Sequence, residues 1–102
     1  VFLALLTSDE PGVTCAFYAH DDFESIGGHR LATLVTDAVA AAGLEGRALP
    51  PRGMRLPLLR ETRMPAVVVE LGPTTEVVVR TPVIADALAD AVERWVAAPV
   101  ES

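Results

Sequence analysis

One carboxylate, Glu70, directly follows a run of four apolar residues. Residues Ala66 to Val69 are small or β-branched, which predicts a buried strand. Ligands of α/β proteins bind beyond the carboxyl ends of such strands, and a carboxylate partly removed from water gains the proton affinity of a general base. Glu70 is therefore a candidate catalytic residue. In the alternative, Glu70 lies in solvent or pairs with an arginine such as Arg60 or Arg63.

The histidines and the cysteine give weaker indications of chemistry. His20 and His29 have a spacing that matches no compact zinc motif. Together with His20, Asp21 and Asp22 would form a weak metal site at most, so we interpret this segment as a solvated loop. We expect His29 in the first turn of a helix. Cys15 lies in a predicted strand with no base near it in sequence, which predicts a buried, inert thiol.

A group of arginines precedes the Glu70 strand. It consists of Arg52, Arg55, Arg60 and Arg63. Guanidinium groups bind carboxylates well, so this group is suited to an anionic glycan or a peptide carboxylate. Pairing with carboxylates of the chain itself is the interpretation that we favour.

Composition limits the class of protein. A chain of 102 residues predicts one domain, residues 1–102, and the apolar fraction of 51% excludes disorder. The net charge of −6 argues against a general nucleic-acid binder. No apolar run reaches the length of a membrane span. Because Val1 lies inside an apolar run, we expect the chain to be processed, trimmed or cut from something longer.

Two further strands and two helices are expected around the Glu70 strand. The apolar residues 1–7 and the β-forming residues 12–20 predict the strands. One helix has an apolar stripe at Leu31, Leu34, Val35, Ala38, Val39 and Ala42. Ser25 is its predicted N-cap and Gly43 its predicted stop.

The second helix is predicted to start at Thr81, as cap, and Pro82, as the first helical residue. Its apolar positions are Val83, Ala87, Leu88, Ala91, Val92, Trp95 and Val96. These elements predict an α/β fold with a mostly parallel sheet flanked by helices.

The central element of this predicted fold is the strand Ala66–Leu71. We expect it to be buried, beside Val1–Leu6 in the sheet and covered by both helices. Val68→Asp should then prevent folding, because it would bury an unpaired charge.

The segment "LLRETRMPAVVVELG", residues 58–72, resembles the C-terminal motif of zinc-dependent N-acetylmuramoyl-L-alanine amidases of the amidase_3 type. These enzymes cleave peptidoglycan between the glycan and its stem peptide. The segments "GVTCAFY", "GHRLATLVTDAVAAAGL" and "TPVIADALADAVERWV" resemble other elements of the same domain. The resemblance implies an amidase-like fold that is truncated at its N-terminus. It also implies that Glu70 matches the glutamate that acts beside the zinc, on the attacking water or the tetrahedral intermediate.

The chain departs from the family at the metal site. The family holds zinc with two histidines and a glutamate, and the resemblance places the first histidine and the glutamate upstream of Val1. The last histidine falls within "LALLTSD", residues 3–9, where Leu5 and Leu6 stand. Leucine cannot bind zinc, so we expect no zinc in this chain unless upstream residues supply ligands. Pro73 also replaces the aromatic residue that follows the family's glutamate.

Two functions follow from the resemblance. The first is a degenerate amidase-like domain, a pseudoenzyme with a binding or regulatory role in bacterial peptidoglycan metabolism. Its partner would be peptidoglycan or a protein of cell-wall synthesis or hydrolysis. The second is the C-terminal part of an active amidase whose metal ligands precede Val1. Both relate the protein to the cell envelope and leave open on which side of the membrane it acts.

Overall fold

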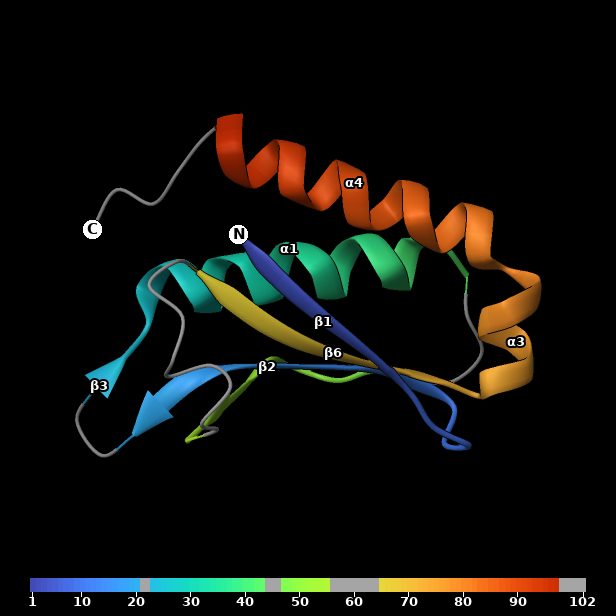
Figure 1. The fold of residues 1–102 in the computed structure, drawn as a ribbon, viewed down its shortest axis with the longest axis horizontal. Coiled ribbons are helices and arrows are strands. Elements are labelled where there is room, and N and C mark those ends of the chain that lie inside the picture. Colours follow the sequence, from blue (N-terminus) through green and yellow to red (C-terminus); the bar gives the residue numbers. More distant parts are fainter. Residues whose placement is uncertain (21–22, 44–46, 56–64, 98–102) are drawn as a thin grey trace.

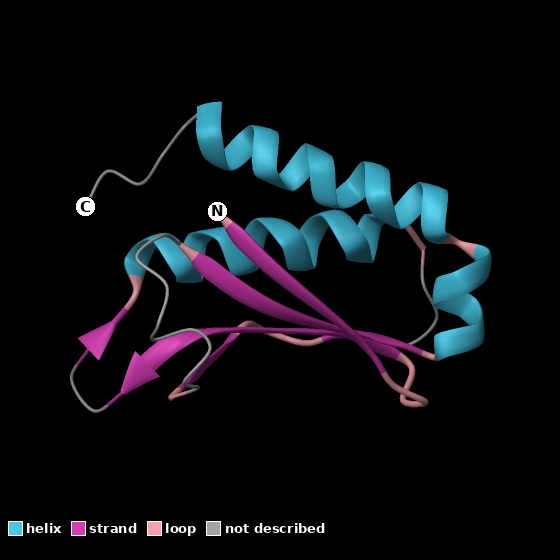
Figure 2. Cartoon of the chain, in the orientation of Figure 1, coloured by secondary structure: helices cyan, strands magenta, loops and turns pink. Residues whose placement is uncertain are grey.

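The computed structural model describes residues 1–20, 23–43, 47–55 and 65–97 (Figures 1 and 2). Its strands are β1 (Phe2–Thr7), β2 (Gly12–His20), β3 (Phe23–Glu24), β4 (Arg47–Ala48), β5 (Arg52–Met54) and β6 (Ala66–Gly72). Its helices are α1 (Ile26–Ala41), α3 (Thr74–Val79) and α4 (Thr81–Ala97). None of the helices in the described ranges is long and apolar enough to cross a membrane.

The sheet is mixed and is centred on β6 and β2. Its strands follow the order β1-β6-β2-β3, and β4 and β5 pair with β2. The pairs β1–β6, β2–β4 and β2–β5 are parallel, whereas β2 runs antiparallel to β6 and β3. The predicted α/β class and the predicted neighbourhood of the first strand and the Glu70 strand are thereby confirmed.

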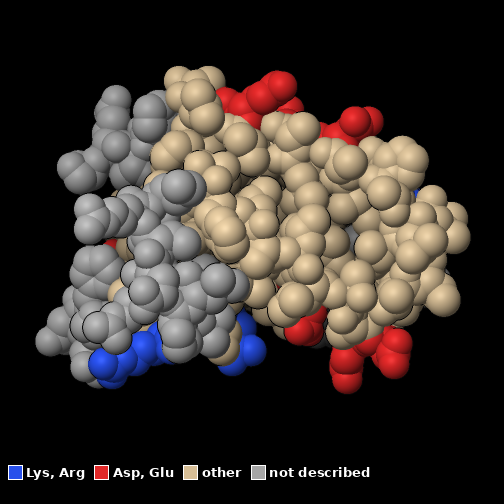
Figure 3. Space-filling model, in the orientation of Figure 1, with Lys and Arg blue, Asp and Glu red and all other residues tan. Residues whose placement is uncertain are grey.

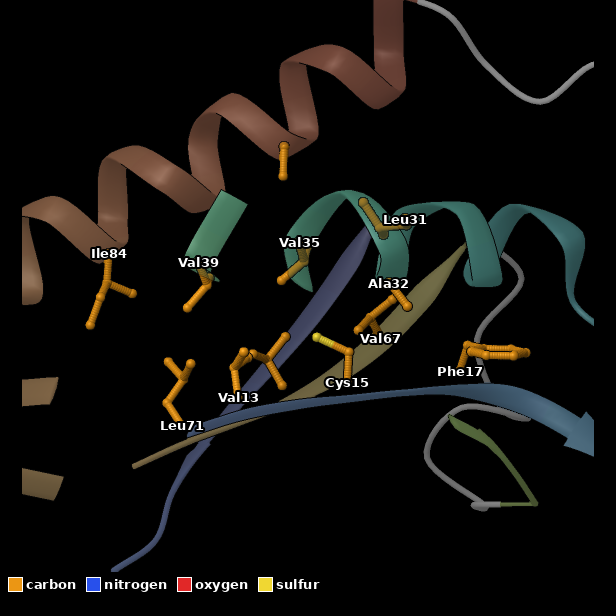
Figure 4. Close-up of a cluster of buried hydrophobic side chains, with 12 residues drawn as sticks. Val13, Cys15, Phe17, Leu31, Ala32, Val35, Val39, Val67, Leu71 and Ile84 are labelled. Atoms are coloured by element: carbon orange, nitrogen blue, oxygen red, sulfur yellow. The ribbon is translucent and has the colours of Figure 1, made fainter. Parts of the chain in front are cut away.

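Side chains of β6 alternate between the two faces of the sheet, and those on one face belong to the core. Val67, Val69 and Leu71 are at most 2% exposed and face α1. The same layer contains Val13, Cys15 and Phe17 of β2 and Leu31, Ala32, Val35 and Val39 of α1 (Figure 4). Burying a valine or leucine side chain contributes roughly 1.5–3 kcal/mol, so this layer is the main source of stability.

Helix α4 lies on α1, on the same side of the sheet (Figure 1). Trp95 Nε1 donates a hydrogen bond to Gly27 O (3.2 Å), and Arg80 NH1 donates one to Ala42 O (3.1 Å). These contacts hold both ends of α4 against α1 in an antiparallel arrangement. Helix α4 packs mainly on α1. Its residues Ile84 and Ala91 belong to the same core cluster as Val67, Val69 and Leu71 of β6.

The predicted ends of the first helix are confirmed. The Ser25 side chain accepts a hydrogen bond from Gly28 N (3.1 Å), and Gly43 adopts a left-handed conformation (φ 82°) after the helix. The predicted role of Thr81 was wrong. Its hydroxyl donates to the carbonyl oxygens of Val77 and Val78, because the preceding residues form the unexpected helix α3.

The structure corrects the expectation for Val68. Its side chain lies on the face of β6 opposite α1 and is only half-buried, whereas Val69 is fully buried. Neighbouring residues of a strand point to opposite faces of the sheet. Substitutions at Val68 and Val69 therefore test which face of β6 is buried.

We predict that Val69→Asp prevents folding, because an unpaired carboxylate would replace a core methyl pair. Val68→Asp, the matched control, should lower the unfolding free energy but leave a cooperative transition. Urea unfolding followed by circular dichroism measures both. Equal loss of structure in the two variants would contradict the assignment of the core face.

Candidate functional site

Glu70 lies near the carboxyl end of β6, as the sequence predicted. Because β1 and β6 are parallel, their carboxyl ends at Thr7 and Gly72 meet at one edge of the sheet. Strand β2 begins at the same edge, with Gly12 opposite Gly72. Glu70 therefore occupies the edge at which open α/β sheets bind ligands.

The sheet register identifies the neighbours of Glu70. Leu6 of β1 pairs with Glu70 on one side, and Thr14 of β2 pairs with it on the other. Residues paired across strands point to the same face, so all three side chains lie on the face opposite α1. Leu5 points to the other face, which leaves Leu6 as the residue of the two leucines that adjoins Glu70.

The loop that joins β1 to β2 closes over this edge. Ser8 N donates to Leu71 O (2.9 Å), and Thr74 Oγ1 donates to Ser8 O (3.2 Å). A Cβ atom on Gly72 would lie 1.9 Å from Glu10 O and 2.7 Å from Ser8 O. Only glycine permits this approach, so the residue that ends β6 also fixes the loop beside Glu70.

A small pocket results from this arrangement. It has a volume of about 200 Å³ and is lined by Ser8, Glu10, Pro11, Gly12, Thr14, Leu49 and Glu70. Glu70 is exposed and forms no ion pair with any residue that the structure describes. With two carboxylates and two hydroxyl groups around it, the pocket is suited to hydrogen-bond donors such as hydroxyl, amide or ammonium groups.

The described side chains around Glu70 do not fit a zinc ion. A catalytic zinc needs three protein ligands, usually histidine, cysteine or carboxylate side chains. The positions that flank Glu70 in the sheet carry leucine and threonine. Within the described ranges, no three His, Cys, Asp or Glu side chains are grouped closely enough to hold a metal.

The side chain of His29 contacts two neighbouring residues, Glu24 and Phe17. It lies in the first turn of α1, as predicted, and its Nδ1 contacts Glu24 Oε1. Its ring stacks on Phe17 with a centroid distance of 4.5 Å. Asp21, Asp22 and the side chain of His20 lie outside the described residues.

Cys15 is fully buried, as the sequence predicted. Burial raises the pKa of its thiol, and a hydrogen bond with the Thr36 side chain opposes this shift in part. A neutral, inaccessible thiol is a poor nucleophile, so Cys15 contributes to packing.

The arginine group is only partly described. Arg52 and Arg55 are exposed, and neither belongs to an ion pair among the residues in the described ranges. For these two arginines, the expected pairing is not found with any carboxylate of the described residues. Arg60 and Arg63 lie outside the described residues.

Solved structures share this fold. The N-acetylmuramoyl-L-alanine amidase from Clostridium difficile 630 superposes with a TM-score of 0.73 at 14% identity, over 96% of this chain and 59% of the amidase. The N-acetylmuramoyl-L-alanine amidase AmiC2 of Nostoc punctiforme gives a TM-score of 0.69 at 18% identity, over 95% and 58%. No protein-family model and no curated protein sequence matches the chain. The predicted amidase-like fold is confirmed, and the chain spans less than two thirds of either amidase.

We predict that Glu70→Gln changes the unfolding free energy by less than about 1 kcal/mol, because the carboxylate is exposed and unpaired among the described residues. Glu76→Gln, a matched control, removes the partner of Arg80 and should cost up to about 1 kcal/mol. Chemical denaturation at pH 7 measures both. A loss above about 2 kcal/mol for Glu70→Gln would show that Glu70 has a structural role.

Proposed function

We propose that the chain is a degenerate N-acetylmuramoyl-L-alanine amidase-like domain that binds its target without cleaving it, in a binding or regulatory role in peptidoglycan metabolism. The observation that carries the proposal is the pairing of Leu6 with Glu70. The sequence resemblance puts the family's last ligand histidine at Leu5 or Leu6. Because leucine cannot coordinate zinc, this position beside Glu70 supplies no metal ligand.

The preserved edge of the sheet supports a binding role. Glu70, Thr14 and the loop containing Ser8 still surround a pocket, although the neighbouring residues do not form a metal site. Peptidoglycan offers hydroxyl and amide groups that carboxylate and hydroxyl side chains can hydrogen-bond. We therefore assign peptidoglycan, or a cell-wall protein presenting similar groups, as the target of this pocket.

An active amidase is the second candidate. Two observations support it. Glu70 lies near the carboxyl end of β6. The two similar amidases also contain further residues outside the part that matches this chain. In that case, zinc ligands would come from residues outside this chain. The encoded sequence before Val1 is the simplest discriminating observation, because it either contains a histidine and a glutamate as ligands or lacks them.

We predict that the protein sediments with purified peptidoglycan and that Thr14→Arg weakens this binding about tenfold or more, because the long side chain fills the pocket. Thr75→Arg on α3 adds the same charge away from the pocket and should bind as the wild type does. Co-sedimentation at several protein concentrations gives the affinities.

The same samples test for catalysis. Under the proposal, neither the wild-type protein nor Glu70→Gln releases soluble fragments from peptidoglycan with zinc present. Hydrolysis by the longest encoded form of the protein, lost in Glu70→Gln, would overturn the proposal in favour of the amidase. Equal binding by Thr14→Arg and the wild type would exclude the pocket as the binding site.

A further inference from the structure

A pocket of about 430 Å³ lies along the first turns of α1. This volume is typical of sites for small molecules. The lining consists of Glu24 of β3 and, from α1, Ile26, His29, Arg30, Thr33 and Leu34. Strand β3 pairs with the end of β2, whereas the pocket beside Glu70 adjoins the start of β2 at Gly12. The two pockets therefore lie at opposite ends of the sheet.

The pocket is formed by side chains of α1 and not by the backbone at its N-terminus. Residues 26, 29, 30, 33 and 34 are three or four positions apart or adjacent, which places their side chains on one face of the helix. The Ser25 hydroxyl already accepts a hydrogen bond from Gly28 N at 3.1 Å. The groups that a ligand meets are therefore the polar and apolar side chains of this face.

Arg30 supplies a cation that has no counter-charge. It forms no ion pair with any residue in the described ranges, and its Nη1 atom is enclosed there without a hydrogen-bond acceptor. A charged donor that lacks an acceptor costs free energy. Glu24, the one carboxylate of the lining, contacts His29 Nδ1 instead. An anion bound in the pocket would supply the counter-charge.

Thr33 and His29 supply hydrogen-bond acceptors. The Thr33 hydroxyl donates to His29 O at 3.1 Å, so its oxygen keeps lone pairs for a further donor. The His29 ring stacks on Phe17, and its Nδ1 lies against a carboxylate oxygen of Glu24. We therefore assign the proton of the neutral imidazole to Nδ1, which leaves Nε2 as an acceptor. The lining thus offers acceptors for an N–H group as well as a cation.

We infer that this pocket binds an N-acylated amino acid with an apolar side chain, which is also the chemistry of a peptide C-terminus. Its carboxylate would pair with Arg30, and the adjacent amide N–H would donate to Thr33 or His29. Its side chain would cover Ile26, which is 57% exposed, and Leu34. This inference does not depend on the proposed peptidoglycan role, because it concerns a different pocket.

Two other classes of anion match the lining less well. A fatty acid has a carboxylate and an apolar chain, but it has no N–H group for the acceptors of Thr33 and His29. Inorganic phosphate has no apolar part, and Glu24 would repel its second negative charge. The combination of one carboxylate, one amide and one apolar group therefore identifies the ligand class.

Arginine side chains lie near the same end of the sheet. Figure 3 shows most of the basic side chains on its face at the end that carries β3 and β5 in Figure 1, whereas most carboxylates lie along other margins. Arg52 and Arg55, in and just after β5, are exposed and form no ion pair in the part that the structure describes. In a chain of net charge −6, this local positive charge favours the approach of an anion.

The probe is N-acetyl-leucine, titrated into isotope-labelled protein and followed by the amide chemical shifts in NMR spectra. For a ligand of this size we expect a Kd of about 1–10 mM. The shifts should change at residues 24–34 and not at Thr14 or Glu70. N-acetyl-leucinamide, which lacks the charge, should bind about tenfold more weakly. Isocaproate, which keeps the carboxylate and lacks the amide, should bind about threefold more weakly.

Substitutions test the cation and the apolar wall separately. Arg30→Gln should weaken the binding of N-acetyl-leucine about tenfold, and Arg30→Lys should weaken it less because the charge remains. Arg94→Gln is the matched control, since Arg94 lies on α4 outside the lining and should bind as the wild type does. Ile26→Glu places a negative charge at an exposed position of the pocket and should also weaken binding about tenfold. Thermal melting verifies that each variant folds.

Four results would overturn the inference. The first is binding that Ile26→Glu and a folded Arg30→Gln variant leave unchanged. The second is equal affinity for N-acetyl-leucine and N-acetyl-leucinamide. The third is the absence of shift changes at residues 24–34 when the probe is tenfold above the expected Kd, or their appearance at Thr14 and Glu70 instead. The fourth is tighter binding of isocaproate or inorganic phosphate, because the amide or the apolar group would then contribute nothing.

Discussion

Strand β6 pairs along its length with β1 on one side and β2 on the other, while its inner face packs on α1. The rest of the structure depends on this arrangement. Val67 and Val69 are fully buried between the sheet and the helix. Their burial determines which residues of β6 face α1 and fixes the register of its strand pairing. A shift of one residue would exchange the two faces, placing Glu70 in the core and Val69 in solvent.

The same register determines the chemistry of the candidate site. Once Val69 faces α1, Glu70 must face the other side, between Leu6 and Thr14. The loop after β1 then lies over Gly72, where a larger residue would collide with Glu10 O. The pocket is thus a consequence of strand alternation and one close backbone contact.

Much of this fold could be predicted from the sequence, since the apolar pattern reveals β1, β2, β6 and the two long helices. The position of Glu70 near the carboxyl end of β6 could also be predicted from the sequence. The choice between Leu5 and Leu6 required the register, and Thr14 was missed because no local pattern reveals a partner from another strand. Helix α3 was missed because Thr74–Val79 is rich in β-branched residues, and its position follows from contacts with the Ser8 loop and α4. The two- and three-residue strands are too short to show any periodicity.

The side chains that flank Glu70 in the sheet, those of Leu6 and Thr14, offer no ligand to a zinc ion. Metal content decides this most directly, by elemental analysis of the protein purified without chelator and melting curves with and without EDTA. We predict well under one zinc per chain and a melting temperature that EDTA does not change. One tightly held zinc per chain, with a lower melting temperature in EDTA, would contradict it.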